Sequence, residues 1–560
     1  MTIQDSKDFD FIVIGAGAAG CLLANRLSKD PAMRVALIEA GASDLHFPVN
    51  VKTTLPVGNV FLLPDARYNW QHVYRGGPEV NGRQIPCPRG KLFGGCTSVN
   101  GTVYMRGHPT DYDQWAALGN DGWGYEDVLT AYRQHENYVG RASNFHGSGG
   151  ELDVRKPGEN NRLAHALIEA AVQRGHQRND DFNGERQDGF GIFDLNQRRG
   201  IRSSSSRAFL HPVLGRGNLS VFADTLVERI NFSGSEAVGV TIRRDGKNQR
   251  LWASKEIVVA AGTVNSPQLL MLSGVGPADA LRGHGIRVVQ DLPGVGANLQ
   301  DHPTVSVAMS NPGAESYALS WQTAPRVAAA PFRYLFARSG MLASNAAEAG
   351  GFLCSSPELD RPDLQMTFMV GLKDNPRTLP RRHGFVLHVA VLRPATRGRL
   401  ELASADPAAR PLMHPNFLQD GGDLRKLIYG LKEARRIISM PALAHYSGRE
   451  LSPGPTVSTD ADLEAFIRAN VATTYHPVGT CKMGPKRDPM AVVDSRLRVH
   501  GLTGLRVADA SIMPNIIGGN TSAPAMMIGE RAANFILEDS TGSSARADRQ
   551  ALGQSGAAYT

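Results

Sequence analysis

The chain has 560 residues, which is too long for one simple core and favours several domain-sized masses. Hydrophobic residues make up 42% and charged residues 20%, and the net charge of +7 comes from scattered basic residues, so we expect no nucleic-acid partner. The five cysteines form no CxxC pair, which argues against a zinc site or a disulfide scaffold and suits a reducing cytoplasm.

The first predicted elements form the start of a nucleotide-binding fold. An apolar run at 11–14 predicts a buried strand, followed at once by a glycine-rich turn at 15–20 and an apolar-faced helix. A second apolar strand follows at 34–38. The acidic stretch at 8–10 runs directly into the first strand in place of a secretory signal, so we expect a cytoplasmic protein.

The glycines of this turn have separate physical roles. Gly15 permits the tight turn, Gly17 lets the backbone approach a pyrophosphate, and Gly20 lets the helix pack closely on the strand. The helix N-terminus then offers unpaired N–H groups to the phosphates. Glu39, 19 residues after Gly20, can accept a hydrogen bond from a ribose hydroxyl. The motif predicts a bound dinucleotide and leaves FAD and NAD open.

Two further glycine clusters follow along the chain. Residues 88–101 (PRGKLFGGCTSVNG) combine glycines with small hydroxyl residues, which suits a loop whose backbone lies close to a planar ligand. Residues 262–276 (GTVNSPQLLMLSGVG) follow an apolar strand at 257–261. The Ser-Pro pair at 266–267 predicts the first turn of a helix, and Gly274 predicts its end.

Both clusters resemble the signature patterns of the glucose–methanol–choline (GMC) oxidoreductases. The second cluster fits throughout, whereas the first departs at Phe93, where an aliphatic residue is usual, and at Cys96, where serine is common. Further stretches that resemble the family lie at 293–303, 475–484 and 505–514. The resemblance therefore covers nearly the whole chain and selects FAD over NAD.

The resemblance implies an α/β fold (α+β overall) in two parts. A Rossmann-like FAD-binding domain, discontinuous in sequence, is joined to a substrate domain whose antiparallel sheet, flanked by helices, forms a roof over the flavin. The expected segments are 8–150, 205–310 and 475–538 for FAD, and 151–204 and 311–474 for substrate. Runs at 364–370 and 384–391 predict strands of the roof. The small polar residues of 541–560 predict a disordered tail.

The resemblance also assigns the catalytic pair. Alcohol oxidation needs a base for the hydroxyl proton while a hydride leaves the carbon, and a neutral imidazole with its ordinary pKa near 6.5 suits that role. His476 opens the family's His-Pro-x-Gly-Thr motif, and Asn520 occupies the partner position, where the family has His or Asn. Asn520 can anchor the substrate oxygen through its amide N–H or cap the following helix, and the two roles can coexist.

The expected ligand contacts follow from the same resemblance. Cofactor contacts are expected from Gly15, Gly17, Ala18, Ala19, Gly20, Glu39, Ala40, Arg89, Gly90, Gly94, Gly95, Thr97, Asn100, Gly101, Val103, Val227, Ala261, Gly262, Asp509, Ala510, Asn520 and Thr521. Glu348, Phe352, Gln365 and Tyr475 are expected to contact substrate, although Glu348 can equally be a paired structural carboxylate. Val99 stands where relatives with a tethered flavin carry histidine, so we expect non-covalent FAD.

Other chemistries find less support in the sequence. The histidines form no HxxxH ligand grouping, so no metal is expected, and no GxSxG strand–turn–helix supports serine hydrolysis. The overall pattern is closest to bacterial aliphatic alcohol dehydrogenases and choline dehydrogenase-like proteins. That likeness implies a primary alcohol with an apolar chain, an aldehyde product and a quinone acceptor. An oxidase, a hydroxynitrile lyase, a photodecarboxylase and a flavin-binding protein without turnover remain alternatives.

One segment bears on location. Residues 321–338 combine Trp321, Phe332 and Phe336 with three arginines. Such a pattern is typical of an element at a membrane interface, and also of a stripe that simply packs on the protein. The expected location is therefore cytoplasmic, with peripheral contact to a bacterial inner membrane as one alternative. The sequence leaves the oligomeric state open.

Overall fold

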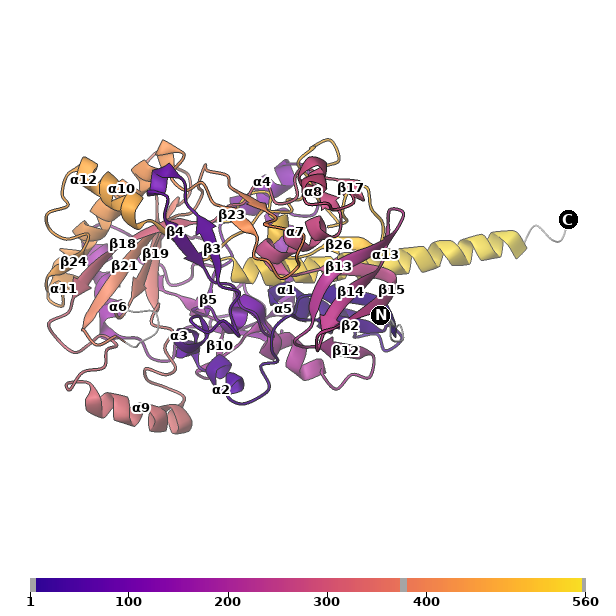
Figure 1. Cartoon of the computed structure of the whole chain (residues 1–560). Coiled ribbons are helices and arrows are strands. Elements are labelled where there is room, and N and C mark those ends of the chain that lie inside the picture. The colour runs from indigo at the N-terminus through magenta and orange to yellow at the C-terminus, as the bar shows by residue number, and fades with distance from the viewer. Residues whose placement is uncertain (1–6, 373–379, 556–560) are drawn as a thin grey trace.

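Two seven-stranded sheets and the helices packed on them make up most of the molecule (Figure 1). The computed structural model describes residues 7–372 and 380–555, with side chains at 8–372 and 380–540. The mixed α/β architecture confirms the fold class expected from the sequence.

The first large sheet is parallel at its centre. Strands β12, β2, β1, β15 and β26 pair in parallel, and β14 and β13 continue from β15 as an antiparallel ribbon. These strands are β1 (Lys7–Ile14), β2 (Val35–Ile38), β12 (Leu219–Phe222), β13 (Leu226–Ser233), β14 (Glu236–Arg244), β15 (Lys247–Val259) and β26 (Leu505–Val507). The whole of β2 is buried, as expected for a parallel strand covered on both faces.

Two helices pack together beside this sheet. Helix α1 (Ala18–Leu27) starts in the glycine turn after β1, and α13 (Ser522–Ser555) lies against it. A Cβ atom on Gly529 would lie 2.9 Å from the Cα of Ala19, so glycine permits this close approach. An ion pair between Arg26 and Glu530 (Nε–Oε1, 2.7 Å) joins the same two helices.

The C-terminal segment differs from the sequence-based expectation. The backbone of α13 continues as a helix to Ser555, where disorder is expected for 541–560. A helix that has already formed extends by one hydrogen bond per residue without a new nucleus, and no proline follows Pro524 to stop it. Residues 556–560 lie outside the described part of the chain.

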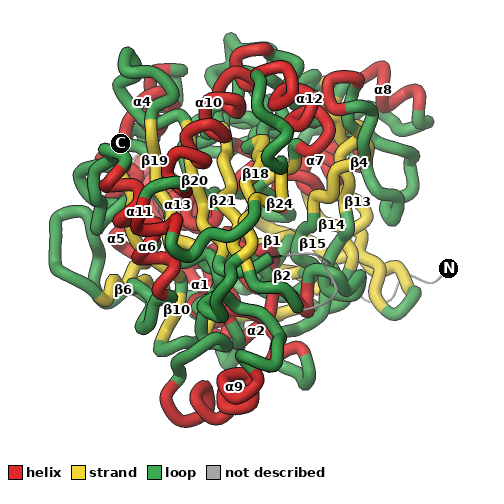
Figure 2. The backbone as a smooth tube through the Cα atoms, turned by 90° about the vertical axis from the view of Figure 1, so that its left-hand side faces the viewer, coloured by secondary structure: helices red, strands yellow, loops and turns green. Residues whose placement is uncertain are grey.

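The second large sheet is antiparallel and lies behind α10 in Figure 2. Its order is β24–β18–β21–β20–β19–β8, and β25 also pairs with β18. The strands are β8 (Gly189–Ile192), β18 (Pro303–Ser310), β19 (Ala349–Leu353), β20 (Leu364–Met369), β21 (Gly384–Val391), β24 (Glu450–Ser452) and β25 (Ala472–Thr473). β20 and β21 confirm the two predicted strands. β18 pairs with β21 from Thr304 to Ser310 and with β25 at Pro303, so residues 303–310 belong to this sheet although they lie inside the segment expected for FAD.

Smaller elements connect the two large sheets. One four-stranded sheet has the order β22 (Arg399–Glu401), β23 (Leu412–His414), β3 (His72–Arg75) and β4 (Gln84–Cys87). The other has the order β5 (Val103–Tyr104), β9 (Asp194–Leu195), β7 (Leu152–Arg155) and β6 (Glu136–Val139). Two strand pairs are β10 (Gln197–Arg198) with β11 (Ile201–Arg202), and β16 (Val275–Gly276) with β17 (Gln290–Asp291). The other helices are α2 (Val49–Thr54), α3 (Asn59–Leu62), α4 (Pro109–Ala117), α5 (Tyr125–His135), α6 (Arg162–Gln173), α7 (Gly262–Leu272), α8 (Ala278–Gly283), α9 (Ala324–Ala337), α10 (Gly421–Ile438), α11 (Pro441–Ala444) and α12 (Asp460–Asn470).

Helix α7 begins earlier than its sequence predicts. It starts at Gly262, so Pro267 lies inside the helix instead of in its first turn. Proline has no N–H to donate to the carbonyl four residues before it, which is that of Thr263. The hydroxyl of Thr480 donates to this carbonyl instead, at 2.6 Å. A distant side chain therefore removes the cost of an unpaired buried carbonyl.

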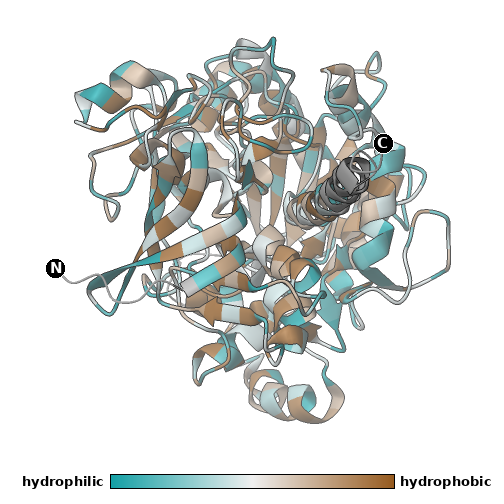
Figure 3. Cartoon of the chain, turned by 90° about the vertical axis from the view of Figure 1, so that its right-hand side faces the viewer, coloured by the Kyte–Doolittle hydropathy of each residue, from teal (hydrophilic) through white to brown (hydrophobic). Residues whose placement is uncertain are grey.

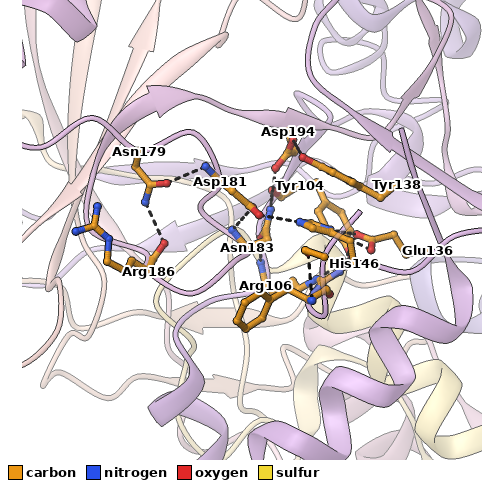
Figure 4. Close-up of polar contacts among 12 residues, drawn as sticks. Tyr104, Arg106, Glu136, Tyr138, His146, Asn179, Asp181, Asn183, Arg186 and Asp194 are labelled. Atoms are coloured by element: carbon orange, nitrogen blue, oxygen red, sulfur yellow. Dashed lines mark hydrogen bonds and ion pairs between the residues drawn. The ribbon is translucent and has the colours of Figure 1, made fainter. Parts of the chain in front are cut away.

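A buried network of charged residues holds the small sheet that contains β5 and β6 (Figure 4). Arg106 Nη2 lies 2.7 Å from Glu136 Oε1, and the ring nitrogens of His146 lie 3.2 Å from Glu136 and 3.0 Å from Asp181. A Cβ on the glycine after Arg106 would lie 3.1 Å from the Cβ of Ile517. The network thus supports a segment that packs against the loop before α13.

Candidate active site

A cavity of about 590 Å³ is lined by residues from both large sheets. Its wall is built from stretches that are far apart in sequence, including parts of 14–19, 38–40, 88–103, 225–227, 260–272, 304–306, 345–369, 472–477 and 509–525. The glycine motifs and the predicted catalytic pair therefore meet at one place.

Most of the residues predicted from the sequence lie on this wall. They are Gly15, Gly17, Ala18, Ala19, Glu39, Ala40, Arg89, Gly90, Gly95, Thr97, Asn100, Gly101, Val103, Val227, Ala261, Gly262, Gln365, Tyr475, His476, Asp509, Ala510, Asn520 and Thr521. Two predicted cofactor residues lie behind it. A Cβ on Gly20 would lie 1.8 Å from the carbonyl oxygen of Gly15, and Gly94 has φ +83°, so both glycines shape the turns instead of forming the wall.

Bare backbone forms part of the cavity wall. A Cβ on Gly101 or Gly262 would have no atom within 4 Å, and one on Gly17 would have its nearest neighbour at 4.0 Å. Gly15 differs, because its φ is +100° and a Cβ there would lie 2.5 Å from the carbonyl oxygen of Ala260, which leaves no room for a side chain. The wall can therefore be approached closely at three glycines by a flat or anionic ligand.

Glu39 closes the glycine turn from the end of β2. Its Oε2 accepts the backbone N–H of Ala16 and its Oε1 that of Gly41, both at 2.9 Å. Burial raises the pKa of Glu39 to about 7, although both N–H donors favour the charged form. Each carboxylate oxygen keeps a second lone pair, so a ribose hydroxyl on the cavity side can still donate to it.

His476 and Asn520 meet on the same wall. Nε2 of His476 lies 3.1 Å from Nδ2 of Asn520. An amide nitrogen can only donate, so Nε2 is the unprotonated nitrogen of the imidazole. Oδ1 of Asn520 in turn accepts from Nε2 of Gln365 at 3.3 Å. Both ends of the Asn520 amide thus have side-chain partners. The next residue, Thr521, stands directly before α13.

A second chain of hydrogen bonds fixes the same tautomer. Nε2 of His302 lies 3.1 Å from the carbonyl oxygen of Ile517, so this nitrogen carries a proton. Burial lowers the pKa of His302 to about 4, which keeps the ring neutral and makes its Nδ1 an acceptor. That Nδ1 lies 3.1 Å from Nδ1 of His476, which must donate, and Oγ1 of Thr474 lies 2.9 Å from the same atom. The lone pair of His476 is therefore on Nε2, where it accepts the N–H of Asn520.

Asp301 holds the backbone of both histidines. Its Oδ1 accepts the N–H of His302 at 2.8 Å and that of His476 at 2.9 Å. Its Oδ2 accepts the hydroxyls of Tyr74 and Thr473. One buried carboxylate thus fixes the relative position of the two rings.

The environment keeps His476 neutral. Burial is the largest cause, followed by repulsion from His302 and from the Arg89 guanidinium, and together they hold the pKa of His476 well below 6.5. At neutral pH the ring can therefore accept a proton. The site combines the neutral imidazole of His476, the amide of Asn520 and the bare backbone of the glycine-rich turns.

Family models decide the relationship of this chain to known proteins. Residues 9–304 and 394–529 each match a model of the GMC oxidoreductases. The chain belongs to the GMC oxidoreductases. It is 42% identical to an alcohol dehydrogenase (acceptor) of Pseudomonas putida, over 94% of this chain and 96% of the relative. It is also 42% identical to an oxygen-dependent choline dehydrogenase of Stenotrophomonas maltophilia, over 95% of each.

Solved structures share the fold of this GMC oxidoreductase. Pyridoxine 4-oxidase from Mesorbium loti superposes with a TM-score of 0.84 at 30% identity, covering 94% of this chain and 98% of that one. Formate oxidase from Aspergillus oryzae gives a TM-score of 0.88 at 25% identity, covering 96% and 99%. The predicted family is confirmed by these findings.

GMC oxidoreductases bind FAD, and the wall of this one fits that cofactor. The open glycines and the N-terminus of α1 suit the pyrophosphate, and Glu39 suits a ribose. Asn100 joins the 88–101 loop to α13, since its Nδ2 lies 3.3 Å from Oγ of Ser522. Asp509 joins the adjacent turn to α7 by accepting the N–H of Gly262 at 2.9 Å. Among the described residues, no group of three or more His, Cys, Asp or Glu side chains is arranged to hold a metal ion.

Two predicted substrate residues do not reach the cavity. Glu348 is buried, and its carboxylate accepts the hydroxyl of Tyr317 at 2.8 Å, the hydroxyl of Ser344 at 2.5 Å and the backbone N–H of Asn161 at 2.6 Å. Phe352 is buried against Phe182, with ring centroids 5.3 Å apart. Glu348 is thus a paired structural carboxylate, which is the second of the two roles expected for it. Phe352 belongs to the core.

The sequence does not single out three residues that the geometry brings to the base. Asp301 and His302 stand in the family-like stretch 293–303, and Thr474 stands two residues before His476. The adjacent acid and histidine in this stretch could have identified Asp301 and His302 as candidate site residues. Asp301 and His302 act through contacts with His476, more than 170 positions away, which no local pattern reveals.

Proposed function

We propose that this GMC oxidoreductase oxidises a primary alcohol to an aldehyde, with His476 accepting the hydroxyl proton. The observation that carries the proposal is the 3.1 Å pairing of His476 Nε2 with Asn520 Nδ2 on the cavity wall. Two independent sets of hydrogen bonds leave the lone pair of His476 on that nitrogen. FAD, when bound, supplies the acceptor for the hydride that leaves the carbon.

The two side chains can hold the alcohol oxygen between them. An alcohol that enters there replaces Asn520 as the donor to His476 Nε2, and its oxygen accepts the Asn520 N–H that is released. The low pKa of His476 keeps the base neutral, and Gln365 holds the amide in its orientation. Proton acceptance at Nε2 places positive charge on a ring whose Nδ1–H already has acceptors.

The wall supports a neutral substrate. Glu348 lies outside the cavity, so the carboxylate expected to serve a cationic alcohol has another role. Val103, Val305, Ala347 and Met369 give part of the wall an apolar surface. This surface favours an alcohol with an apolar chain over choline.

We propose a quinone as the electron acceptor and non-covalent FAD. The P. putida relative is described as acting with an acceptor, whereas the S. maltophilia relative is described as oxygen-dependent. Reaction with oxygen needs a positive charge close to the reduced flavin, and the proton that His476 takes from the alcohol would supply one, so the quinone proposal rests on the likeness to the P. putida relative. A hydroxynitrile lyase remains the second candidate, because a neutral imidazole is also the base for cyanohydrin cleavage.

Anaerobic titration of the holoenzyme tests the proposal. A panel of straight-chain primary alcohols should bleach the yellow flavin, and choline should do so far less effectively. Reoxidation should be faster with a short-chain quinone than with air-saturated buffer. A flavin that stays yellow with every alcohol while cyanohydrins are cleaved would establish the lyase. Reoxidation by oxygen as fast as by quinone, with stoichiometric peroxide, would make the enzyme an oxidase.

A further inference from the structure

Helix α9 turns its apolar side chains outward. Phe332, Leu335 and Phe336 are 65%, 62% and 86% exposed, and Trp321, just before the helix, is 84% exposed. The buried residues of α9 are Ala330 and Tyr334. A helix on a soluble protein normally directs its apolar face to the core, so this arrangement is inverted. Figure 3 colours several positions of this helix, at the lower edge of the view, brown for hydrophobic.

A second exposed apolar segment lies beside α9. Phe47, just before α2, is 83% exposed, and Val51 within α2 is also exposed. Figures 1 and 2 both place α2 next to α9. The β10–β11 hairpin joins them, since Tyr334 donates to the carbonyl of residue 200 at 3.1 Å and Arg202 donates to the carbonyl of residue 56 at 2.8 Å. We call Phe47, Val51, Trp321, Phe332, Leu335 and Phe336 the α9–α2 surface.

The charges that the two segments themselves carry are of one sign, and one acid from elsewhere, Glu159, pairs with Arg333 at 2.8 Å. Residues 317–347 contain three arginines and no Asp or Glu, and residues 45–64 contain one lysine and no Asp or Glu. Arg198 and Arg199 are exposed in the hairpin between the two segments. Exposed aromatic rings among arginines match the interfacial region of an anionic bilayer.

We propose that the α9–α2 surface docks this enzyme on an anionic phospholipid bilayer. The aromatic side chains enter the interface between headgroups and acyl chains, and the exposed Arg199 and Arg338 contact the phosphates. Docking is peripheral, because within 7–372 and 380–555 no helix is long and apolar enough to cross a membrane. The inference rests on surface composition and is independent of the proposed reaction.

The docking surface adjoins the cavity. Helix α3 follows α2 closely, and its Phe61 is exposed while its Asn59 lines the cavity wall. Leu63, directly after α3, also lines that wall. A docked molecule therefore holds one wall segment of the cavity near the lipid, where an apolar alcohol and a quinone both dissolve.

Vesicle flotation of the purified holoenzyme tests the proposal. Wild-type enzyme should float with vesicles of equal parts phosphatidylglycerol and phosphatidylcholine, and less with phosphatidylcholine alone. The triple variant Trp321→Ser/Phe332→Ser/Phe336→Ser should partition at least about tenfold less, because three interfacial anchors are lost. The matched control Leu118→Ser/Val172→Ser removes exposed apolar side chains elsewhere and should float like the wild type.

Dye-linked turnover in detergent-free buffer separates docking from folding and from catalysis. All three proteins should retain flavin and equal turnover with a soluble dye, whatever the substrate proves to be. Flotation of the triple variant equal to that of the wild type would overturn the proposal, as would failure of the wild type to bind anionic vesicles. A lipid-free wild-type dimer that the triple substitution converts to monomer would show that a second copy covers this surface instead.

Discussion

Nδ1 of His302 accepts a hydrogen bond from Nδ1–H of His476 across 3.1 Å, with the two rings at 85° to each other. His302 is itself held in one tautomer by the carbonyl of Ile517. The carbonyl of Ile517, acting through His302, therefore determines that Nδ1 of His476 carries the proton. Nε2 is left as the basic nitrogen. Under the proposed function, His302 is a positioning residue and His476 is the catalytic one.

Replacement of the base should sharply reduce turnover and leave the fold intact. We expect His476→Ala to keep its flavin and to lose about 10²–10⁴-fold in kcat, because the hydroxyl proton then has no positioned acceptor. Asn520→Ala should lose less, since it removes a hydrogen bond and not the base. His165→Ala, on the exposed side of α6, serves as the control. Near wild-type turnover of His476→Ala would refute the assignment.

Replacement of His302 should change the pH profile as well as the rate. In His302→Leu, the Nδ1–H of His476 loses a buried acceptor, and we expect kcat/KM to fall by about 10–100-fold. Repulsion from His302 also lowers the pKa of His476, so the acid limb of kcat/KM should move to higher pH. His302→Asn, which retains an acceptor, should recover part of the rate. A loss of rate without any shift of the acid limb would indicate a purely structural role.

His146 should make stability depend on pH. Burial opposes its charged form, but hydrogen bonds to Asp181 and Glu136 outweigh burial and raise its pKa above 6.5. A raised pKa in the folded state gives stability that is fully present below 6.5 and is lost as pH rises through the folded value. The difference in Tm between wild type and His146→Gln should therefore shrink with rising pH. The exposed His165→Gln is the control, and a pH-independent difference would contradict the prediction.

The flavin should be released by denaturation. Val99 lies on the cavity wall at the position of the expected attachment histidine and has no nucleophile. Acid or heat precipitation should therefore leave the yellow colour in the supernatant. Cys96 also lines the wall and carries the thiol of the same loop. Colour that stays in the wild-type pellet but is released from Cys96→Ser would show a link through that thiol.

The parts of the site that lie in contiguous motifs could be predicted from the sequence. The glycine turn at 15–20 and the positions of His476 and Asn520 follow from short patterns, and the structure brings them to one cavity. Features that depend on a distant partner could not be predicted. Pro267 lies inside α7 because Thr480 serves the carbonyl that it leaves unpaired.

Two further differences have the same origin. Glu348 turns away from the cavity because three donors from other segments satisfy its carboxylate. The boundary at residue 303 follows from the pairing of β18 with β21, some 80 residues later in the chain. Local patterns specify an element, but its partners in space decide which way a side chain points and which sheet a strand joins.

The dispersed origin of the cavity wall has a thermodynamic consequence. A ligand that fills this space touches both large sheets at once, so it binds only the state in which every contributing segment is in place. Its binding free energy then adds to the free energy of unfolding by mass action. Depletion of the cofactor should consequently lower the melting temperature of the whole molecule and expose β18 and the 88–101 loop to proteases together.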